Sequence, residues 1–305
     1  MRHDDFHLPA ALLAAIRQNC AEKTAPWADI TRIHCLGGGS ISRAFVLESG
    51  HDKIFVKVNA AERVEMFAAE ADGLVALAGC PALCVPRVIG YGSQDEHAYL
   101  ILEHLDLLPL RHNADSVAAG RALAALHGIS GSSFGWQRDN FIGSTPQYNN
   151  QHATWAAFFN SQRLQTQLTL AKQRGATSRM IERGLQLAER LDELFTDHRP
   201  AASLLHGDLW YGNAAVDSKR RLVLFDPAVY FGDREADLAM CELFGGFSDE
   251  FFAAYRQALP LPVGYTRRKT LYQLYHVLNH FNLFAGGYHG RAERMIDKLL
   301  ADVVA

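Results

Sequence analysis

The sequence lacks the features that mark nucleic-acid-binding and disulfide-rich proteins. It has no basic excess: 30 Lys and Arg residues stand against 33 Asp and Glu residues, and the formal net charge is −3. A nucleic-acid-binding protein usually has a strongly basic balance, so we expect no nucleic-acid partner. The five cysteines are an odd number in a chain of 305 residues, which does not indicate a disulfide framework.

No segment has the character of a membrane anchor or a secretion signal. The longest uncharged apolar run, residues 73–85, is too short to span a bilayer and contains Pro81. Only a short apolar stretch without a cleavage site follows the N-terminal residues, so we expect no signal peptide. No internal repeat or low-complexity segment is present. We expect a cytoplasmic protein without a membrane partner, and its oligomeric state stays open.

What the sequence does contain is a polar stretch at residues 204–237, LLHGDLWYGNAAVDSKRRLVLFDPAVYFGDREAD. Asn213 follows Asp208 by five residues, and a turn and an apolar run then lead to Asp226. This is the residue order of a kinase catalytic loop. Phosphoryl transfer needs a carboxylate near the attacking hydroxyl and oxygen ligands that hold Mg²⁺ on the nucleotide phosphates. We therefore predict Asp208 as the catalytic carboxylate, and Asn213 and Asp226 as metal ligands held apart by a hairpin over residues 214–225.

A glycine-rich turn between two predicted strands is a candidate phosphate-binding loop. Glycine has no Cβ, so its backbone N–H groups can approach a polyphosphate closely. The same turn also fits a plain hairpin, and its consecutive glycines depart from the G-x-G-x-x-G pattern. The residues that we predict to contact a nucleotide here are Gly37, Gly38, Gly39 and Ser40.

A single lysine, Lys57, lies in the apolar run of the next predicted strand, residues 53–59. An outward-pointing Lys is common on an edge strand, but the preceding glycine-rich turn favours Lys57 as a ligand of the α- and β-phosphates. A helix predicted over residues 62–78 offers Glu70 to pair with Lys57 and keep it charged, with Glu65 as the alternative.

Two further strands, residues 88–92 and 98–103, complete a predicted sheet. The second strand ends at Glu103, and the chain continues through His104 and Leu105. In a two-lobed kinase this is the hinge, so we expect the backbone of these three residues to bind the adenine edge.

The rest of the chain is predicted to be mainly helical. Apolar spacing marks helices at residues 8–23, 116–129, 155–174, 178–197, 235–244, 249–259, 266–285 and 293–304. Residues 130–151 are expected to form a long loop, and loops of this length are usually functional or mobile. The predicted fold class is α+β with two kinase-like lobes: residues 1–105 form a nucleotide-binding sheet lobe with one key helix, and residues 106–305 form a helical catalytic and substrate lobe.

Several motifs together resemble the fructosamine kinase family, the ketosamine-3-kinases, which are related to aminoglycoside phosphotransferases. They are HGDLWYGN, DPAVYFGDREADLAM, NFIGSTPQ, GGGSIS, FVKVN and YHVLNHFNLFAGGY, and the similarity runs from Ile33 to Tyr288. The resemblance implies a protein-kinase-like fold and transfer of phosphate from ATP, with Mg²⁺, to O3 of a fructosamine or ribulosamine, free or on a protein. The unstable 3-phosphate is then lost and the amine is repaired. Ser40 is a departure, because some members of the family carry cysteine there.

Four residues are candidates for contact with the substrate, namely Trp210, Asp233, Asn140 and His280. Trp210 either stacks on the sugar or its amine carrier, or fills the core. Asp233, like Asp237, either meets a cationic amine or forms an internal ion pair with Arg234, whereas Glu235 is expected to begin a helix.

The histidines near these motifs are expected to have mainly structural roles. His206 should brace the catalytic loop without taking part in the chemistry. His276, Asn279 and His280 share one helix face, where they line the substrate cleft or form a buried polar group. Two histidines four residues apart can bind a metal, but the sequence indicates no acidic third ligand.

Two other functions stay open from the residues alone. A kinase for another small amine or sugar, of aminoglycoside or choline type, shares the catalytic motif. An aminoglycoside enzyme needs a strongly acidic cleft, and residues 130–151 contain only Asp139 as an acid. A non-catalytic pseudokinase is free to lose the motif residues, all of which are intact. The sequence does not select the sugar or its amine carrier, and Cys35 is a candidate redox-sensitive thiol.

Overall fold

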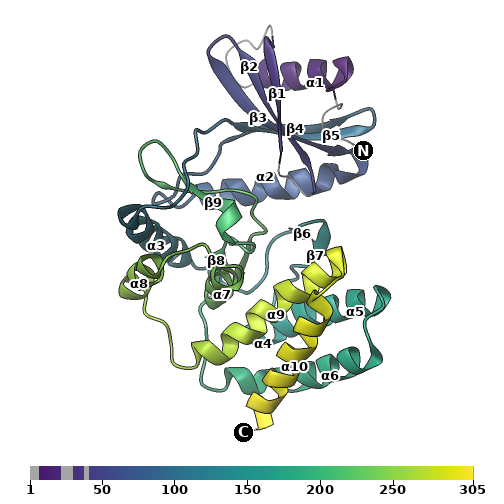
Figure 1. Ribbon diagram of the computed structural model, residues 1–305, viewed down its shortest axis with the longest axis vertical. Coiled ribbons are helices and arrows are strands. Elements are labelled where there is room, and N and C mark those ends of the chain that lie inside the picture. The colour runs from purple at the N-terminus through teal and green to yellow at the C-terminus, as the bar shows by residue number, and fades with distance from the viewer. Residues whose placement is uncertain (1–6, 22–29, 38–40, 305) are drawn as a thin grey trace.

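The N-terminal part of the chain folds around a five-stranded antiparallel sheet (Figure 1). This computed structural model describes residues 7–21, 30–37 and 41–304. Across the sheet the strands are β1 (Arg32–Leu36), β2 (Arg43–Ser49), β3 (Asp52–Ala60), β5 (His97–Glu103) and β4 (Val88–Gln94). All five predicted strands are confirmed, and β3, which carries Lys57, lies in the middle.

The two faces of this sheet pack against different helices. On β5, Tyr99 and Ile101 pack with α1 (Ala10–Ala21), whereas Leu100 and Leu102 pack with α2 (Val64–Ala78). Successive side chains of a strand point to opposite faces, so a strand that is covered on both faces must be apolar throughout. The run AYLIL in β5 meets this requirement.

The second half of the molecule is mainly helical (Figure 1). Its helices are α3 (Asn113–His127), α4 (Trp155–Phe158), α5 (Gln165–Gln173), α6 (Ser178–Glu189), α7 (Glu235–Leu243), α8 (Asp249–Ala258), α9 (Tyr265–Phe284) and α10 (Tyr288–Val304). One apolar cluster joins α3 to α7 and α8, and another joins α4, α5 and α6 to α9 and α10. Several helix ends differ from the prediction by a few residues, because apolar spacing does not mark where a final turn unwinds.

Two predicted helices are interrupted. A π-helical turn, Phe159–Leu164, lies between α4 and α5 within the helix expected over residues 155–174. The helix expected over residues 178–197 ends at Glu189 and is followed by a 3₁₀ turn, Leu191–Phe195. A spacing argument assumes 3.6 residues per turn, so neither change of pitch is visible to it.

The helical half also contains short strand pairs, and one of them is bonded to segments that lead to or from the sheet. The predicted hairpin is confirmed as β9 (Ala214–Val216) and β10 (Leu222–Leu224). On its outer edges, the backbone of Leu108 bonds to Val216 in β9, and that of Cys84 bonds to both ends of β10. Another pair joins β8 (Ser203–Leu205) to β11 (Tyr230–Gly232).

The segment expected to be a loop over residues 130–151 contains a small hairpin. Its strands are β6 (Asn140–Ile142) and β7 (Thr145–Gln147), joined by Gly143 in the left-handed conformation at φ +63°. Strands of three residues give too little alternation to be predicted from a polar sequence.

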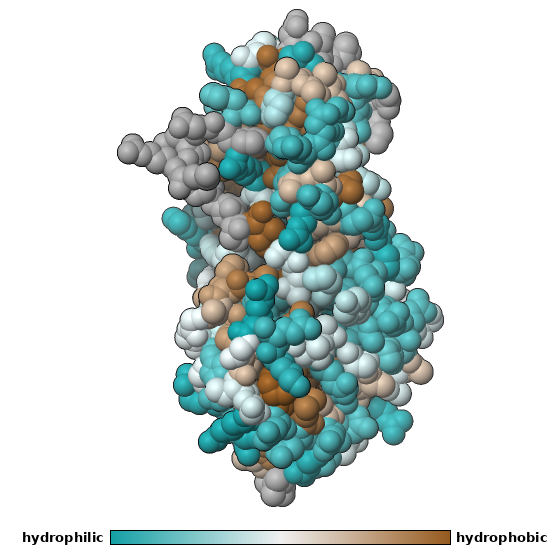
Figure 2. Space-filling model, turned by 90° about the vertical axis from the view of Figure 1, so that its right-hand side faces the viewer, coloured by the Kyte–Doolittle hydropathy of each residue, from teal (hydrophilic) through white to brown (hydrophobic). Residues whose placement is uncertain are grey.

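The described part of the chain has no helix long and apolar enough to cross a membrane. The face of the molecule drawn in Figure 2 is mainly hydrophilic, and the hydrophobic patches on its coloured atoms are small and separated. A large contiguous apolar patch, as is typical of a protein interface, is not seen on those atoms.

Burial of His276 in α9 predicts a loss of stability in acid. Burial lowers the pKa of His276 to about 3, from an ordinary value near 6.5. The unfolded chain therefore binds a proton at pH 5.5 that the folded chain does not. From pH 7.5 to 5.5 this residue should lower the free energy of unfolding by about 1.4 kcal/mol. Urea denaturation at both pH values should show a smaller loss in His276→Gln. The exposed control His51→Gln should lose as much as the wild type, and equal losses in all three proteins would refute the prediction.

Candidate active site

A cavity of about 450 Å³ lies between the sheet and residues 208–228. The predicted site residues that line it are Gly37, Lys57, Glu70, Asn140, Asp208, Trp210, Asn213 and Asp226. Gly38, Gly39 and Ser40 lie outside the described residues. Segments that are distant in the sequence therefore meet around one hollow.

Lys57 lies at the centre of the cavity wall. Its buried ammonium group donates to Glu70 Oε1 at 2.6 Å and to Asp226 Oδ1 at 2.5 Å. Burial alone would lower the pKa of Lys57, but the two carboxylates outweigh it and raise the pKa above the ordinary value. Burial also raises the pKa of Glu70, and the ammonium group opposes that shift. The predicted contact with Glu70 is confirmed, and the alternative Glu65 instead pairs with Arg138.

His206 joins the two loops that carry the candidate catalytic and metal-binding residues. Its Nδ1 accepts the backbone N–H of Asp208 at 3.3 Å, so the ring proton lies on Nε2, which donates to the carbonyl oxygen of Phe225 at 3.0 Å. Burial lowers the pKa of His206, which keeps the ring neutral. The bracing position predicted for this residue is confirmed.

Gly207 allows these loops to approach each other. Its backbone is left-handed at φ +84°, and a Cβ there would lie 2.0 Å from the carbonyl oxygen of Ala228. No other residue satisfies both conditions without moving the backbone.

The carboxylate of Asp237 fixes the backbone just before Asp208. It accepts the backbone N–H groups of His206 at 2.7 Å and Gly207 at 2.9 Å, and it contacts His127 Nε2 at 3.2 Å. His127 in turn contacts the hydroxyl of Tyr255 at 2.8 Å. Asp237 is buried beneath the loop, so the hypothesis that it meets a substrate amine is wrong.

Asp208 lines the cavity, and the pKa of its carboxyl group is raised. Burial, and then the negative charges of Asp226 and Asp237, raise the pKa of Asp208 to about 7, while a hydrogen bond from Asn213 opposes the shift. A carboxyl group with a pKa near neutrality is suited to accepting a proton from a hydroxyl.

Asn213 and Asp226 fit a site for a hard divalent cation. Asn213 donates its Nδ2 to the carbonyl oxygen of Asp208 at 2.9 Å, which leaves its Oδ1 to face the cavity. Asp226 accepts a hydrogen bond from Lys57 through Oδ1, and its side chain is half exposed. Carboxylate and amide oxygens are the ligands that Mg²⁺ uses in proteins. Asp226 also has a left-handed backbone at φ +57°, a conformation that is rare outside glycine and clusters at functional sites.

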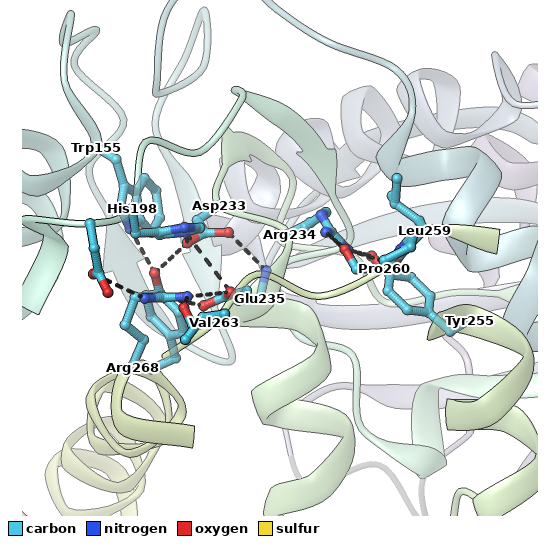
Figure 3. A network of polar contacts seen from close by, with 12 residues as sticks. Trp155, His198, Asp233, Arg234, Glu235, Tyr255, Leu259, Pro260, Val263 and Arg268 are labelled. Carbon is cyan, nitrogen blue, oxygen red and sulfur yellow. Dashed lines mark hydrogen bonds and ion pairs between the residues drawn. The ribbon is translucent and has the colours of Figure 1, made fainter. Parts of the chain in front are cut away.

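Asp233, predicted to contact the substrate, is instead part of a buried network (Figure 3). It accepts from the hydroxyl of Tyr272 at 2.5 Å and contacts His198 Nε2 at 2.7 Å, while its other oxygen accepts the backbone N–H of Glu235. It is 1% exposed. The prediction is wrong because the chain turns into α7 at this point and carries the side chain away from the cavity.

The neighbouring charges also have partners other than those expected. Arg234 points away from Asp233 and donates to Tyr255, Leu259 and Pro260 (Figure 3). Glu235 begins α7, as expected, and is held by Arg268 through hydrogen bonds of 2.8 and 2.9 Å. Both of these side chains are fully buried.

Trp210 and Asn140 both line the cavity but differ in what they offer a ligand. The ring of Trp210 lies over Gly212 and is 41% exposed, so it is free to contact a ligand. Asn140 is buried, donates to the carbonyl oxygen of Val229 at 2.7 Å, and accepts from Gln147 and Asn149. These bonds to protein groups give the amide of Asn140 a structural role, and its contact with a substrate stays a prediction.

Other predicted residues lie away from the cavity lining. His280 packs among the rings of Phe244, Phe284 and Tyr288. The backbone of Glu103 pairs with Arg87. Glu103, His104 and Leu105 are not among the described residues that line the cavity, and their contact with adenine stays a prediction.

One residue of the site was missed at the level of sequence. Asn59, at the end of β3, donates its side-chain amide to the carbonyl oxygen of Ile41 at 3.0 Å and to the hydroxyl of Ser42 at 3.1 Å. It thereby fixes the exit of the glycine-rich turn. The only signal was a polar residue two positions after Lys57, on the same face of the strand.

Comparison with known sequences identifies the family to which this chain is similar. A family model described as fructosamine kinase matches residues 12–302. A probable ketoamine kinase from Synechocystis is 44% identical over 287 residues, which cover 93% of this chain and 96% of the relative. A chloroplastic protein-ribulosamine 3-kinase from Arabidopsis thaliana is 38% identical over 274 residues, covering 89% of this chain and 83% of the relative.

Solved structures show the same similarity in three dimensions. A crystal structure assigned as a fructosamine-3-kinase, from Haemophilus somnus, superposes with a TM-score of 0.86 at 31% identity, covering 93% of this chain and 96% of the other. An aminoglycoside phosphotransferase in complex with AMP-PNP and hygromycin B has a TM-score of 0.63 at 18% identity, covering 93% and 98% of the two chains. The latter likeness concerns the fold alone.

Arg268 should be essential to stability because it neutralises Glu235 inside the protein. Arg268→Met leaves a buried carboxylate without its partner and should lower the free energy of unfolding by about 3–5 kcal/mol, measured by urea denaturation at pH 7.5. The control Lys269→Met removes a cation from the same helix turn whose pair with Glu242 is partly exposed, and it should cost about 1 kcal/mol or less. Equal losses in the two variants would contradict the buried network.

Proposed function

This chain belongs to the fructosamine kinase family, and on that premise we propose that it transfers the γ-phosphoryl group of ATP to the O3 hydroxyl of a ketosamine. The observation that carries the proposal is the position of Lys57, held between Glu70 and Asp226 in the wall of a cavity that Asp208 also lines. An ammonium group fixed in this way supplies the positive charge that phosphoryl transfer requires.

Lys57 and the glycine-rich turn form the nucleotide side of the proposed site. Lys57 contacts the α- and β-phosphates, and Glu70 keeps its ammonium group oriented. Gly37 and the three residues after it contribute backbone N–H groups to the phosphates. The backbone of Glu103, His104 and Leu105 binds the adenine edge, in a sheet lobe of residues 1–105 that meets a catalytic lobe of residues 106–305.

Asn213 and Asp226 would hold Mg²⁺ through their side-chain oxygens, and the ion would neutralise charge on the phosphates. Asp226 contacts Lys57 through Oδ1, so its other carboxylate oxygen would be the one to meet the ion. The hairpin β9–β10 keeps the two ligands at a fixed separation.

Asp208 orients the acceptor hydroxyl and accepts its proton. Because its pKa is raised to about 7, this carboxyl group can hold the proton that it accepts from the hydroxyl. His206, Gly207 and Asp237 fix the loop, so the carboxylate needs little reorganisation when the substrate arrives.

The substrate is a sugar carried on an amine, either free or attached to a protein. The relatives named as ketoamine and ribulosamine kinases support this class, and the exposed ring of Trp210 provides a surface for the sugar or its amine carrier. We propose that the protein acts in the cytoplasm, where ATP is available.

Asp208→Asn should abolish turnover while leaving nucleotide binding nearly intact, because an amide cannot accept the proton but fills the same space. Turnover should fall by about a factor of 10³ or more, measured by ADP release, with the affinity for Mg·AMP-PNP changed by less than about threefold. The exposed carboxylate control Asp192→Asn should behave as the wild type. Substantial activity in Asp208→Asn would remove Asp208 from this role.

The acceptor class can be tested directly. Turnover with Mg·ATP should be found for ribuloselysine and fructoselysine and be absent for choline and kanamycin, with the phosphate located at O3 by NMR. Chelation of Mg²⁺ by EDTA should stop the reaction, and added Mg²⁺ should restore it. Turnover on choline or kanamycin alone would keep the phosphotransfer chemistry and refute the ketosamine.

A further inference from the structure

The segment of residues 136–149, which we call the strut, contacts both elements that supply carboxylates to Lys57. It leaves the helical half of the molecule, reaches the sheet-side helix α2, and returns through the β6–β7 hairpin. Its polar side chains are bonded at one end to α2 and at the other to the chain just after Asp226.

At the α2 end, the strut binds both oxygens of Asp72. The indole N–H of Trp136 donates to Oδ2 at 2.6 Å, and the side-chain amide of Gln137 donates to Oδ1 at 3.1 Å. Asp72 follows Glu70 by two residues, which on a helix is a rotation of about 200°. The strut therefore holds α2 from one side while Glu70 faces Lys57 on the other.

At its other end, the strut binds the backbone that follows Asp226. Asn140 donates to the carbonyl oxygen of Val229 at 2.7 Å, and Gln147 donates to that of Ala228 at 3.1 Å. Gln147 also donates to Asn140 Oδ1 at 2.7 Å, so the two amides restrain each other. These carbonyl groups lie two and three residues after Asp226. Because they are so near in the chain, the strut also restrains the position of Asp226.

The two ends are connected by direct packing. The ring of Trp136 lies 5.3 Å from that of Phe231. Gly73 in α2 lies against the segment after Asp226, where an added Cβ would be 3.1 Å from Pro227 Cγ. A shift of α2 is therefore felt at Asp226, and the reverse also holds.

We propose that the strut sets the separation of Glu70 and Asp226 at which both contact Lys57, and that Trp136, Asn140 and Gln147 are positioning residues for phosphoryl transfer. The inference rests on the proposed function in that it takes Lys57 as the nucleotide ligand. No part of the strut needs to touch the acceptor, because it acts through α2 and through the backbone after Asp226.

The test compares Trp136→Phe with a control at another contact between the strut and α2. Trp136→Phe keeps an aromatic ring against Phe231 and removes the N–H donated to Asp72 together with part of the indole ring. The control is Glu65→Gln, which breaks the exposed pair with Arg138. Affinity for Mg·AMP-PNP, hydrogen exchange of α2 amides and thermal unfolding are measured for each protein. Asp72→Asn, alone and combined with Trp136→Phe, completes a double-variant cycle.

We expect Trp136→Phe to weaken Mg·AMP-PNP binding by about tenfold and to speed hydrogen exchange in α2 but not in α10. Glu65→Gln should change binding by less than about twofold. The double variant should bind Mg·AMP-PNP no more weakly than the weaker-binding single variant. The reason is that both substitutions affect the same contact between Trp136 and Asp72. Wild-type affinity in Trp136→Phe, or equal acceleration of exchange in α2 and α10 with a lower Tm, would overturn the proposal.

These measurements need no acceptor, so they are independent of the ketosamine assignment. If the wild type phosphorylates no ketosamine but Trp136→Phe weakens nucleotide binding, the ketosamine assignment is refuted and the proposed role of the strut is supported. A protein that phosphorylates ketosamines equally well with and without the Trp136 N–H keeps the acceptor and refutes the strut.

Discussion

The structure depends first on the burial of one ammonium group. Lys57 is surrounded by the sheet and α2, where an unpaired charge would be strongly unfavourable. Its two partners come from α2 and from a loop 169 residues further along the chain. Satisfying Lys57 therefore brings the sheet, the helix and the catalytic stretch into one arrangement, and the cavity is the space left between them. The same contacts that stabilise the charge fix the ammonium group in the cavity wall.

A second layer of polar groups lies behind the cavity and has a different task. Asp237 restrains the catalytic loop through backbone N–H groups, and Asp233 and Glu235 hold α7 against α9. These acids are buried, whereas Asp226 retains a half-exposed side chain. Burial thus separates carboxylates that shape the site from those that face a ligand, although all of them lie within one short stretch. Rigid support of this kind lets a loop hold reacting groups in place.

The sequence was informative where chemistry and local periodicity coincide. The five strands, the β9–β10 hairpin and the contact of Lys57 with Glu70 were predicted because alternation and helical spacing fix which way a side chain points. Asp233, Asn140 and His280 were placed near the substrate on motif membership alone. Asp233 and His280 lie away from the cavity, and Asn140 lines it with its amide bonded to protein groups. In irregular segments no period fixes direction, so only tertiary contacts decide it. The strut illustrates this, since its contacts with Asp72 and Val229 join residues that are far apart in the chain.

The β9–β10 hairpin is bonded on both edges, by Cys84 before β4 and by Leu108 after β5. Both segments lead to or from the sheet, so the sheet is attached to the helical half along this line. A rotation that preserves these hydrogen bonds has its axis beside Asn213 and Asp226, and points near an axis move least. The predicted metal ligands Asn213 and Asp226 therefore lie where such a rotation displaces atoms least.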